Sequence, residues 1–291
     1  MRHVVIVGAG GQLATDLAPA LAADARVTAL PHARLDVGDA EQAAEALGAL
    51  APDVVVNTSA FHKVDVCETE PGDAFRVNAV GAYHLARLAG RLGYTLVHFS
   101  TDYVFDGRRS VPYRETDPAN PLNVYGASKL AGEQLVRAFA PRHFLVRTTG
   151  LYGTAGASAK GGNFVETMIR LGAAGPVRVV DDQVVTPTAT ADLAGAVAAL
   201  LRRAGDPAVP YGLYHITSAG QCSWYAFAQA IFARCGMAVD LAPISSAESS
   251  ATARRPAFSV LDHGKWRAAG FAELRPWRDA LDDYLRAKGH A

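Results

Sequence analysis

Apolar residues form short continuous runs that alternate with stretches of helical periodicity through the first half of the chain. Four runs are of strand length and rich in valine, isoleucine and leucine: 3–7, 26–30, 53–57 and 95–100. Unbroken runs of this kind are typical of strands that are buried on both faces of a sheet. Between them, the spacing of apolar residues predicts three helices, over 12–23, 40–50 and 74–92.

Strands that alternate with helices predict an α/β fold, with a doubly wound parallel sheet of the Rossmann kind over 1–150. After residue 150 the pattern changes, and 153–162 is rich in glycine, alanine and serine, which indicates a loop. We expect a smaller C-terminal lobe, which binds the substrate, from 151–180 and 214–291. The segment 181–213 is expected to pack back onto the first lobe.

A glycine-rich turn, Gly8-Ala9-Gly10-Gly11-Gln12-Leu13-Ala14, follows the first predicted strand. Gly8 and Gly11 fit a Gly-x-x-Gly-x-x-Gly pattern, in which Ala14 takes the third place. Such glycines let the backbone approach a pyrophosphate and leave the amides of a helix N-terminus facing it. We interpret the turn as a dinucleotide site; the alternative is a tight strand-to-helix turn with no ligand.

The end of the second predicted strand bears on the choice of dinucleotide. An acidic residue at this point would bind the adenosine ribose and repel a 2′-phosphate. The chain has no acid there, and it has His32 and Arg34, which carry groups that can meet a phosphate. The sequence therefore favours NADPH, with NADH, and a solvated loop around Arg34, as the alternatives.

Three side chains in the right order predict carbonyl reduction. Thr101 ends the fourth strand, at the sheet edge where ligands bind in this fold. Tyr125 and Lys129 follow at a spacing of four, so on a helix they share one face. Reduction of a ketone needs a proton donor; a phenol with a pKa of about 10 becomes one near neutrality when an ammonium group stabilises its phenolate. Thr101 would hydrogen-bond the carbonyl oxygen.

Further segments make the chain resemble the dTDP-4-dehydrorhamnose reductase family. Ser100-Thr101-Asp102-Tyr103-Val104-Phe105-Asp106-Gly107 is one of them, and the others lie at 64–71, 121–126, 129–133, 162–164, 182–183, 187–188 and 253–256. The resemblance implies an oxidoreductase that reduces the 4-keto group of a nucleotide-activated 6-deoxyhexose with NAD(P)H. The reaction expected is that of dTDP-4-dehydro-L-rhamnose to dTDP-L-rhamnose.

The resemblance also implies the roles of individual residues, with Thr101, Tyr125 and Lys129 as the catalytic triad. Cofactor contacts are implied for Gly11, Gln12, Leu13, Asp36, Val37, Ala60, Phe61, His62, Phe99, Tyr125 and Lys129. Thr101 and Asp102 would touch the sugar. Gly150 departs from the pattern, because the best-known members carry there a tryptophan that contacts the sugar. Asp16 matches an acid that holds magnesium in some members, but a later acidic position is Ala191, and we predict no metal site.

Other candidates for the nucleotide-sugar site lie late in the chain. Asn163 and Phe164 begin a predicted helix, and Arg255 offers a guanidinium group that suits bidentate binding of a diphosphate. The alternatives are a core position for Phe164 and a solvated loop for Arg255. Trp224 and its aromatic neighbours are predicted to be core residues.

Composition narrows the surroundings in which the protein works. Lysines and arginines total 28, as do aspartates and glutamates, so no excess of positive charge indicates nucleic acid or an anionic membrane as a partner. The three cysteines are an odd number without metal-ligand spacing, which indicates reduced thiols. We expect a cytoplasmic protein without a signal peptide or membrane span; a homodimer is left open.

Three alternatives to the expected reaction remain. One is another nucleotide-sugar 4-ketoreductase, and one is an epimerase, which uses the same triad. A third is a non-catalytic subunit that binds NADP and resembles the β subunit of methionine adenosyltransferase. A dehydratase is disfavoured, because Tyr103 stands where that class has a glutamate after the Thr-Asp pair.

Overall fold

A six-stranded parallel sheet lies at the centre of the computed structural model, which describes residues 1–155 and 162–290. Its strands are β1 (Arg2–Ala9), β2 (Ala25–Pro31), β3 (Val54–Asn57), β4 (Thr95–Thr101), β5 (His143–Thr148) and β10 (Gly212–His215). The spatial order is β10-β5-β4-β3-β1-β2, so the chain moves from β1 to one side and then returns to the other side for β3. Such a reversal opens a crevice at the carboxyl ends of the strands.

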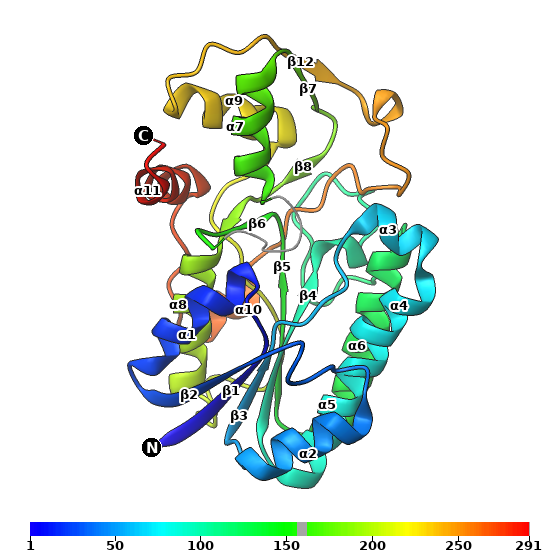
Figure 1. The fold of residues 1–291 in the computed structure, drawn as a ribbon, viewed down its shortest axis with the longest axis vertical. Helices are drawn as coiled ribbons and strands as arrows, with labels where there is room; N and C mark the ends of the chain where they lie inside the picture. The colour runs from blue at the N-terminus through cyan, green and yellow to red at the C-terminus, as the bar shows by residue number, and fades with distance from the viewer. Residues whose placement is uncertain (156–161, 291) are drawn as a thin grey trace.

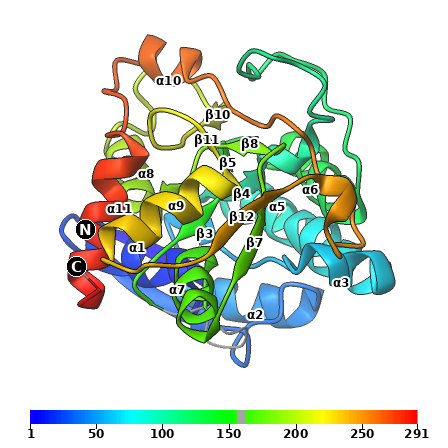
Figure 2. The same cartoon turned by 90° about the horizontal axis from the view of Figure 1, so that it is seen from above.

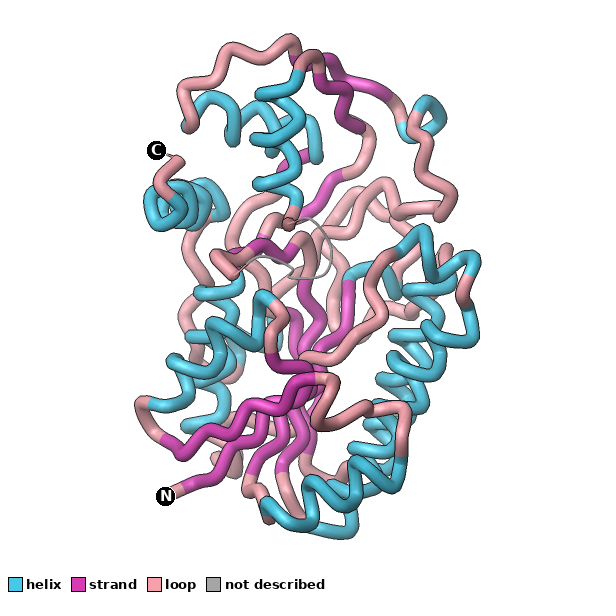
Figure 3. Tube along the Cα trace, in the orientation of Figure 1, coloured by secondary structure: helices cyan, strands magenta, loops and turns pink. Residues whose placement is uncertain are grey.

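Helices cover both faces of this sheet (Figures 1 and 3). One face carries α1 (Gln12–Ala22), α8 (Thr190–Arg202) and α10 (Gly264–Ala268). The other carries α2 (Ala40–Leu50), α5 (Gly81–Leu92) and α6 (Val124–Phe139). Along β1, Val4 and Ile6 face the first set of helices, whereas Val5 and Val7 face the second. Burial on both sides explains the unbroken apolar runs and confirms the doubly wound α/β fold.

The helix expected over 74–92 is interrupted. The chain instead forms α3 (Val64–Thr69), α4 (Pro71–Phe75) and a π-helical turn (Arg76–Val80) before α5 begins. The π turn points the buried Asn78 inward, where its amide group accepts from the Phe61 amide at 2.9 Å and donates to the Phe61 carbonyl at 2.9 Å. It also donates to the Ser128 hydroxyl on α6 at 3.0 Å. A local change of helical register thus fixes the loop after β3.

A second group of elements lies beyond the carboxyl ends of the sheet, and Figure 2 looks down on it. Its helices are α7 (Phe164–Ala174), α9 (Trp224–Arg234) and α11 (Trp277–Lys288). Its short strands pair as β6 (Leu151–Tyr152) with β9 (Thr188–Ala189), β7 (Val177–Val180) with β12 (Leu241–Ile244), and β8 (Val184–Val185) with β11 (Cys222–Ser223). A short 3₁₀ helix, Ser246–Glu248, follows β12, and another, Asp102–Val104, directly follows β4 of the sheet. This group has its own apolar cluster, which includes Phe227, Ile231 and Leu281.

The packing bears on the lobes expected from the sequence. Helix α8, within 181–213, packs against α1 on the sheet. However, Tyr214 and His215 of β10 and Trp266 of α10, all within the expected second lobe, also belong to the sheet and its core. The exact division into lobes therefore stays a prediction. The loop expected over 153–162 falls mostly outside the described residues.

Candidate active site

A pocket of about 350 Å³ opens at the carboxyl ends of β1, β3, β4 and β5. Ten of the residues predicted for catalysis, cofactor or substrate line it: Gly11, Gln12, Leu13, Ala60, His62, Phe99, Thr101, Asp102, Tyr125 and Lys129. These residues come from the ends of three strands, β1, β3 and β4, and from two helices, α1 and α6. The fold therefore gathers the predicted chemistry in one place, which we call the active-site pocket.

The glycine turn has a steric reason for its sequence. Gly8 adopts a φ of 91°, and a Cβ atom there would lie 2.7 Å from the Ser59 amide nitrogen and 2.9 Å from the Thr58 hydroxyl. Only glycine fits such a backbone and such a contact. The close approach of the turn to the end of β3 leaves the first amides of α1 at the pocket, where they suit a pyrophosphate. Gly8 itself lies behind the pocket lining.

The predicted adenosine contacts after β2 do not line the pocket. Arg34 is exposed to solvent. Asp36 forms an ion pair with Arg76 at 2.8 Å and accepts from the Gly38 amide. Val37 is buried, against Gly81 of α5. Their roles toward a dinucleotide, like that of Phe61, stay predictions.

The Tyr125–Lys129 pair lies on the first two turns of α6. Asn123 caps this helix by accepting from the Gly126 amide at 2.7 Å. Lys129 is buried, and its Nζ donates to the Phe99 carbonyl of β4 at 2.5 Å. Burial lowers the pKa of Lys129, and the nearby Glu133 carboxylate opposes this shift, so that the resulting pKa is about 8. A lysine with this pKa is mostly protonated at neutral pH.

The environment of Tyr125 keeps its proton in place at rest. Burial raises the pKa of the Tyr125 phenol, and the Thr101 hydroxyl opposes this shift by stabilising the phenolate. The ring is held edge-on by Tyr103, with ring centroids 5.9 Å apart. A protonated phenol in a pocket is a proton donor, which is the role that carbonyl reduction requires.

The buried carboxyl group of Asp102 holds the Thr101 side chain in place. Its hydroxyl donates to Asp102 Oδ1 at 3.0 Å and accepts from the Tyr103 amide at 3.2 Å. Burial raises the pKa of Asp102 to about 6, and neighbouring hydroxyl groups hold it below the value that burial alone would give. Asp102 is 2% exposed, so it reaches the pocket mainly through Thr101.

An ion pair that sequence reasoning missed lies one turn beyond Lys129. Glu133 of α6 accepts from Arg147 of β5 through two hydrogen bonds of 2.8 and 2.7 Å. Their side chains are 0% and 3% exposed, respectively. The Arg147 guanidinium also lies over the Phe105 ring, 4.9 Å from its centroid. This bidentate pair joins α6 to the sheet one helical turn after Lys129.

Two residues predicted for the nucleotide-sugar do not line the pocket. Asn163 caps α7, and its side-chain amide donates to Gln12 Oε1 at 3.0 Å and to the Tyr284 hydroxyl at 3.1 Å. It therefore fixes Gln12, which does line the pocket. Phe164 stacks on Phe227 with centroids 5.5 Å apart, as in its core alternative. Contacts of both residues with a substrate stay predictions.

Arg255 also lies outside the pocket lining. Its guanidinium forms an ion pair with Asp65 at 2.8 Å and interacts with the side chain of Tyr103, which does line the pocket. Asp65 further accepts from the Ala253 amide at 2.9 Å, so it joins α3 to the loop that carries Arg255. The predicted contact with a diphosphate is not tested by this geometry.

Trp224, predicted to be a core residue, packs against the apolar cluster of the second group and also lines the active-site pocket. Its ring lies against that of Phe164, with centroids 4.7 Å apart. The helical spacing of an aromatic residue does not distinguish a position in the core from one in the lining of a pocket. Thr148, Thr149, Gly150 and Leu151 line the pocket as well and were not predicted to bind a ligand.

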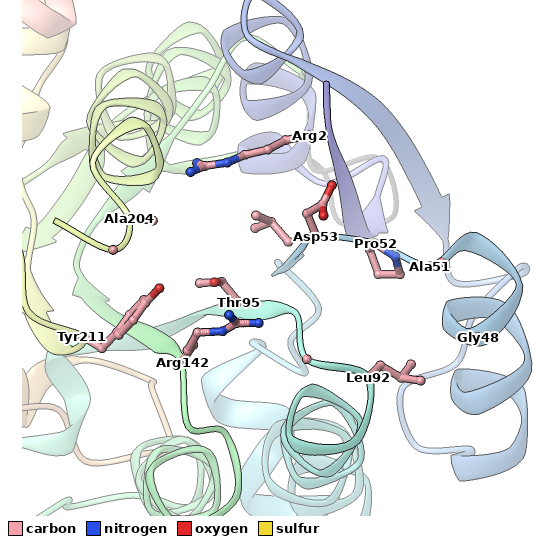
Figure 4. A pocket seen from close by; sticks show the side chains of 13 residues that line it. Arg2, Gly48, Ala51, Pro52, Asp53, Leu92, Thr95, Arg142, Ala204 and Tyr211 are labelled. Atoms are coloured by element: carbon pink, nitrogen blue, oxygen red, sulfur yellow. The ribbon is translucent and has the colours of Figure 1, made fainter.

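A second pocket, of about 520 Å³, lies at the opposite edge of the sheet (Figure 4). It is lined near the amino ends of the strands by residues such as Arg2, Thr95, Arg142 and Tyr211. Ligands of doubly wound sheets bind at the carboxyl edge. The chemistry predicted from the sequence is therefore expected in the active-site pocket.

No group of three or more histidine, cysteine, aspartate or glutamate residues in the described part of the chain is arranged to hold a metal ion. In the same part of the chain, no helix combines the length and the apolar character needed to cross a membrane. Asp16 accepts from the Thr190 hydroxyl, and Asp192 forms an ion pair with Arg275 at 2.8 Å.

Comparison with known proteins places this site in a family. Residues 1–289 match the family model described as the RmlD substrate binding domain. The spore coat polysaccharide biosynthesis protein SpsK of Bacillus subtilis is 41% identical over 295 residues, 100% of this chain and 99% of the relative. The dTDP-4-dehydrorhamnose reductase of Streptomyces griseus is 44% identical over 289 residues, 97% of this chain and 93% of the relative.

A solved structure gives the same result. The dTDP-4-dehydrorhamnose reductase of Bacillus anthracis, in complex with NADP, superposes with a TM-score of 0.92 at 36% identity, and covers 98% of this chain and 99% of its own. The fold and the sequence of this chain match those of the relatives over essentially the full length. The chain belongs to the dTDP-4-dehydrorhamnose reductase family.

Proposed function

We propose that this protein uses NADPH to reduce the 4-keto group of a nucleotide-activated 6-deoxyhexose, and that it converts dTDP-4-dehydro-L-rhamnose to dTDP-L-rhamnose. The observation that carries the proposal is the meeting of Thr101, Tyr125 and Lys129 in one pocket beside the glycine turn. Relatives named for this activity, one of them with bound NADP, support it.

The residues of the pocket fit the cofactor and the reaction. The turn around Gly8 and the first amides of α1 would hold the pyrophosphate, and Lys129 would hold the nicotinamide ribose. When bound, NADPH supplies the hydride that reduces the carbonyl carbon. Tyr125 donates its proton to the carbonyl oxygen. The Thr101 hydroxyl, turned from Asp102 Oδ1 toward the substrate, orients that oxygen by donating a hydrogen bond to it. The Lys129 ammonium stabilises the phenolate that remains.

The decisive experiment is an assay of NADPH oxidation with dTDP-4-dehydro-L-rhamnose, with product identified by chromatography. Stoichiometric loss of NADPH and formation of a 4-hydroxy sugar are expected. Conversion of a nucleotide-sugar without net loss of NADPH would favour an epimerase. The absence of turnover, together with tight association with another protein, would favour a regulatory subunit.

NADPH is expected to give a higher kcat/KM than NADH. Two features of the segment after β2 favour NADPH: Arg34 is exposed, and the residues between β2 and Arg34 include no acid that would repel a 2′-phosphate. A charge-assisted contact with a 2′-phosphate is worth about 1.5–3 kcal/mol, so Arg34→Ala should narrow the preference by about tenfold or more. Arg91→Ala, at an exposed position on α5, is the control and should leave the ratio unchanged. A preference for NADH in the wild-type enzyme would refute the assignment.

We also propose that Arg255 binds the substrate diphosphate. Arg255→Ala should raise KM for the nucleotide-sugar, but not for NADPH, by the equivalent of about 1.5–3 kcal/mol. Asp65→Asn separates this role from a structural one, because it removes the ion-pair partner and keeps the guanidinium. A similar rise in KM for both variants would mean that the ion pair only holds the loop.

The location and assembly of the protein are also proposals. Cys67, Cys222 and Cys235 form no disulfide in the described structure. Reduced thiols are the rule in reducing compartments, so they support the cytoplasmic location that we propose. A homodimer stays open and is measured by sedimentation of the purified protein.

A further inference from the structure

Two residues of the second group of elements line the active-site pocket, Leu151 of β6 and Trp224 of α9. Among the described residues that line it, Trp224 alone comes from beyond residue 151. Helix α9 lies above the sheet in Figure 1. Trp224 is therefore the one aromatic side chain that this group brings to the described lining.

The position of this ring is fixed by its surroundings. Trp224 is the first residue of α9, and Ser223 caps the helix by accepting from the Ala226 amide at 3.0 Å. Phe164 lies behind the indole, with centroids 4.7 Å apart, and stacks in turn on Phe227. A preorganised aromatic ring costs little entropy when it meets a ligand.

Gly150 also lines the pocket and offers no side chain with which to contact a ligand. Gly150 lines the pocket with a φ of 59°, and a Cβ atom there would lie 3.1 Å from the Pro187 Cα atom. A larger residue at this position would be strained and crowded. Thr101 and Tyr125 provide the polar groups for the reacting carbonyl. The indole of Trp224 adds a large apolar surface to the same pocket.

We propose that Trp224 determines specificity for the hexose, by packing its indole against the apolar face and the C6 methyl group of a 6-deoxy sugar. This inference rests on the proposed function. Aromatic rings pair well with C–H-rich surfaces, and pockets that orient a ligand combine such surfaces with a few polar groups. A 6-hydroxyl group at this place would lose its hydrogen bonds to water, so a 6-deoxyhexose is selected over its hydroxylated analogue.

Fluorescence tests the contact without turnover. The chain has three tryptophans, and Trp266 and Trp277 are both 3% exposed, outside the active-site pocket. Addition of dTDP-L-rhamnose should change the tryptophan emission, whereas dTDP alone should change it much less. Trp224→Phe should abolish the response, and the control Trp266→Phe should keep it. An equal response to dTDP alone would place the indole on the nucleotide instead, and no response would remove Trp224 from the site.

Kinetics test the specificity. Trp224→Ala should raise KM for the sugar nucleotide about tenfold and leave KM for NADPH unchanged, with Trp224→Phe in between. The preference for 6-deoxy over 6-hydroxy substrate should fall in parallel. An equal rise in both KM values, or an unchanged preference, would overturn the inference. This result can be told apart from a failure of the proposed function. If the wild-type protein showed no turnover but kept the sugar-dependent fluorescence response, the proposed reaction would be refuted and the contact of Trp224 with the sugar would stand.

Discussion

Tyr125→Phe is expected to lower kcat by about 10²–10⁴-fold, the usual contribution of general acid catalysis, while affinity for NADPH stays nearly unchanged. The substitution keeps the ring, which packs edge-on against Tyr103, and deletes the only proton that the ring donates. Burial raises the pKa of Tyr125, so the wild-type phenol is protonated at rest and the substitution removes a proton that the wild-type enzyme holds. Single-turnover and steady-state kinetics with dTDP-4-dehydro-L-rhamnose measure the effect.

Tyr83→Phe is the matched control, because Tyr83 lies on α5 with its ring against Phe139 and takes no part in the pocket. It should behave like the wild-type enzyme. If Tyr125→Phe also retained near-wild-type kcat, the phenol would not be the proton donor. The non-catalytic subunit would then become the better interpretation of this chain.

The parts of the structure that the sequence predicts well are those fixed by local patterns. The apolar run around Val4–Val7 is buried on both faces, so its composition alone identifies a central strand. Tyr125 and Lys129 are one helical turn apart, and Thr101 ends a strand, so their meeting follows from the topology of a doubly wound sheet. The glycine turn is predictable because it directly follows the first strand of such a sheet.

The parts that it does not predict depend on contacts between distant segments. Trp224 has the spacing of a core residue, and only the placement of α9 over the sheet edge brings its ring to the pocket. Asn163 is recognisable as the start of a helix, but its contact with Gln12 spans 151 positions. The π turn at Asn78 inserts one residue into a helical pattern that reads as continuous. Periodicity carries no information about such events.

Loss of the buried ion pair should have the largest effect on stability. Arg147→Met is expected to lower the free energy of unfolding by about 3–5 kcal/mol, because it leaves the Glu133 carboxylate buried without its partner. The pair is 3% and 0% exposed, and both of its hydrogen bonds would be lost together. Denaturant unfolding of the purified protein measures the change.

The double variant Glu133→Leu/Arg147→Met removes both charges and should recover much of the lost stability, since an apolar pair of similar volume often replaces a buried ion pair at little cost. Arg178→Met is the control, because the Arg178–Glu248 pair is 61% and 53% exposed and such a pair contributes about 0–1 kcal/mol. Equal losses from Arg147→Met and Arg178→Met would mean that water reaches the buried pair. A double variant no more stable than Arg147→Met would instead mean that the guanidinium acts mainly through its contact with the Phe105 ring, 4.9 Å away.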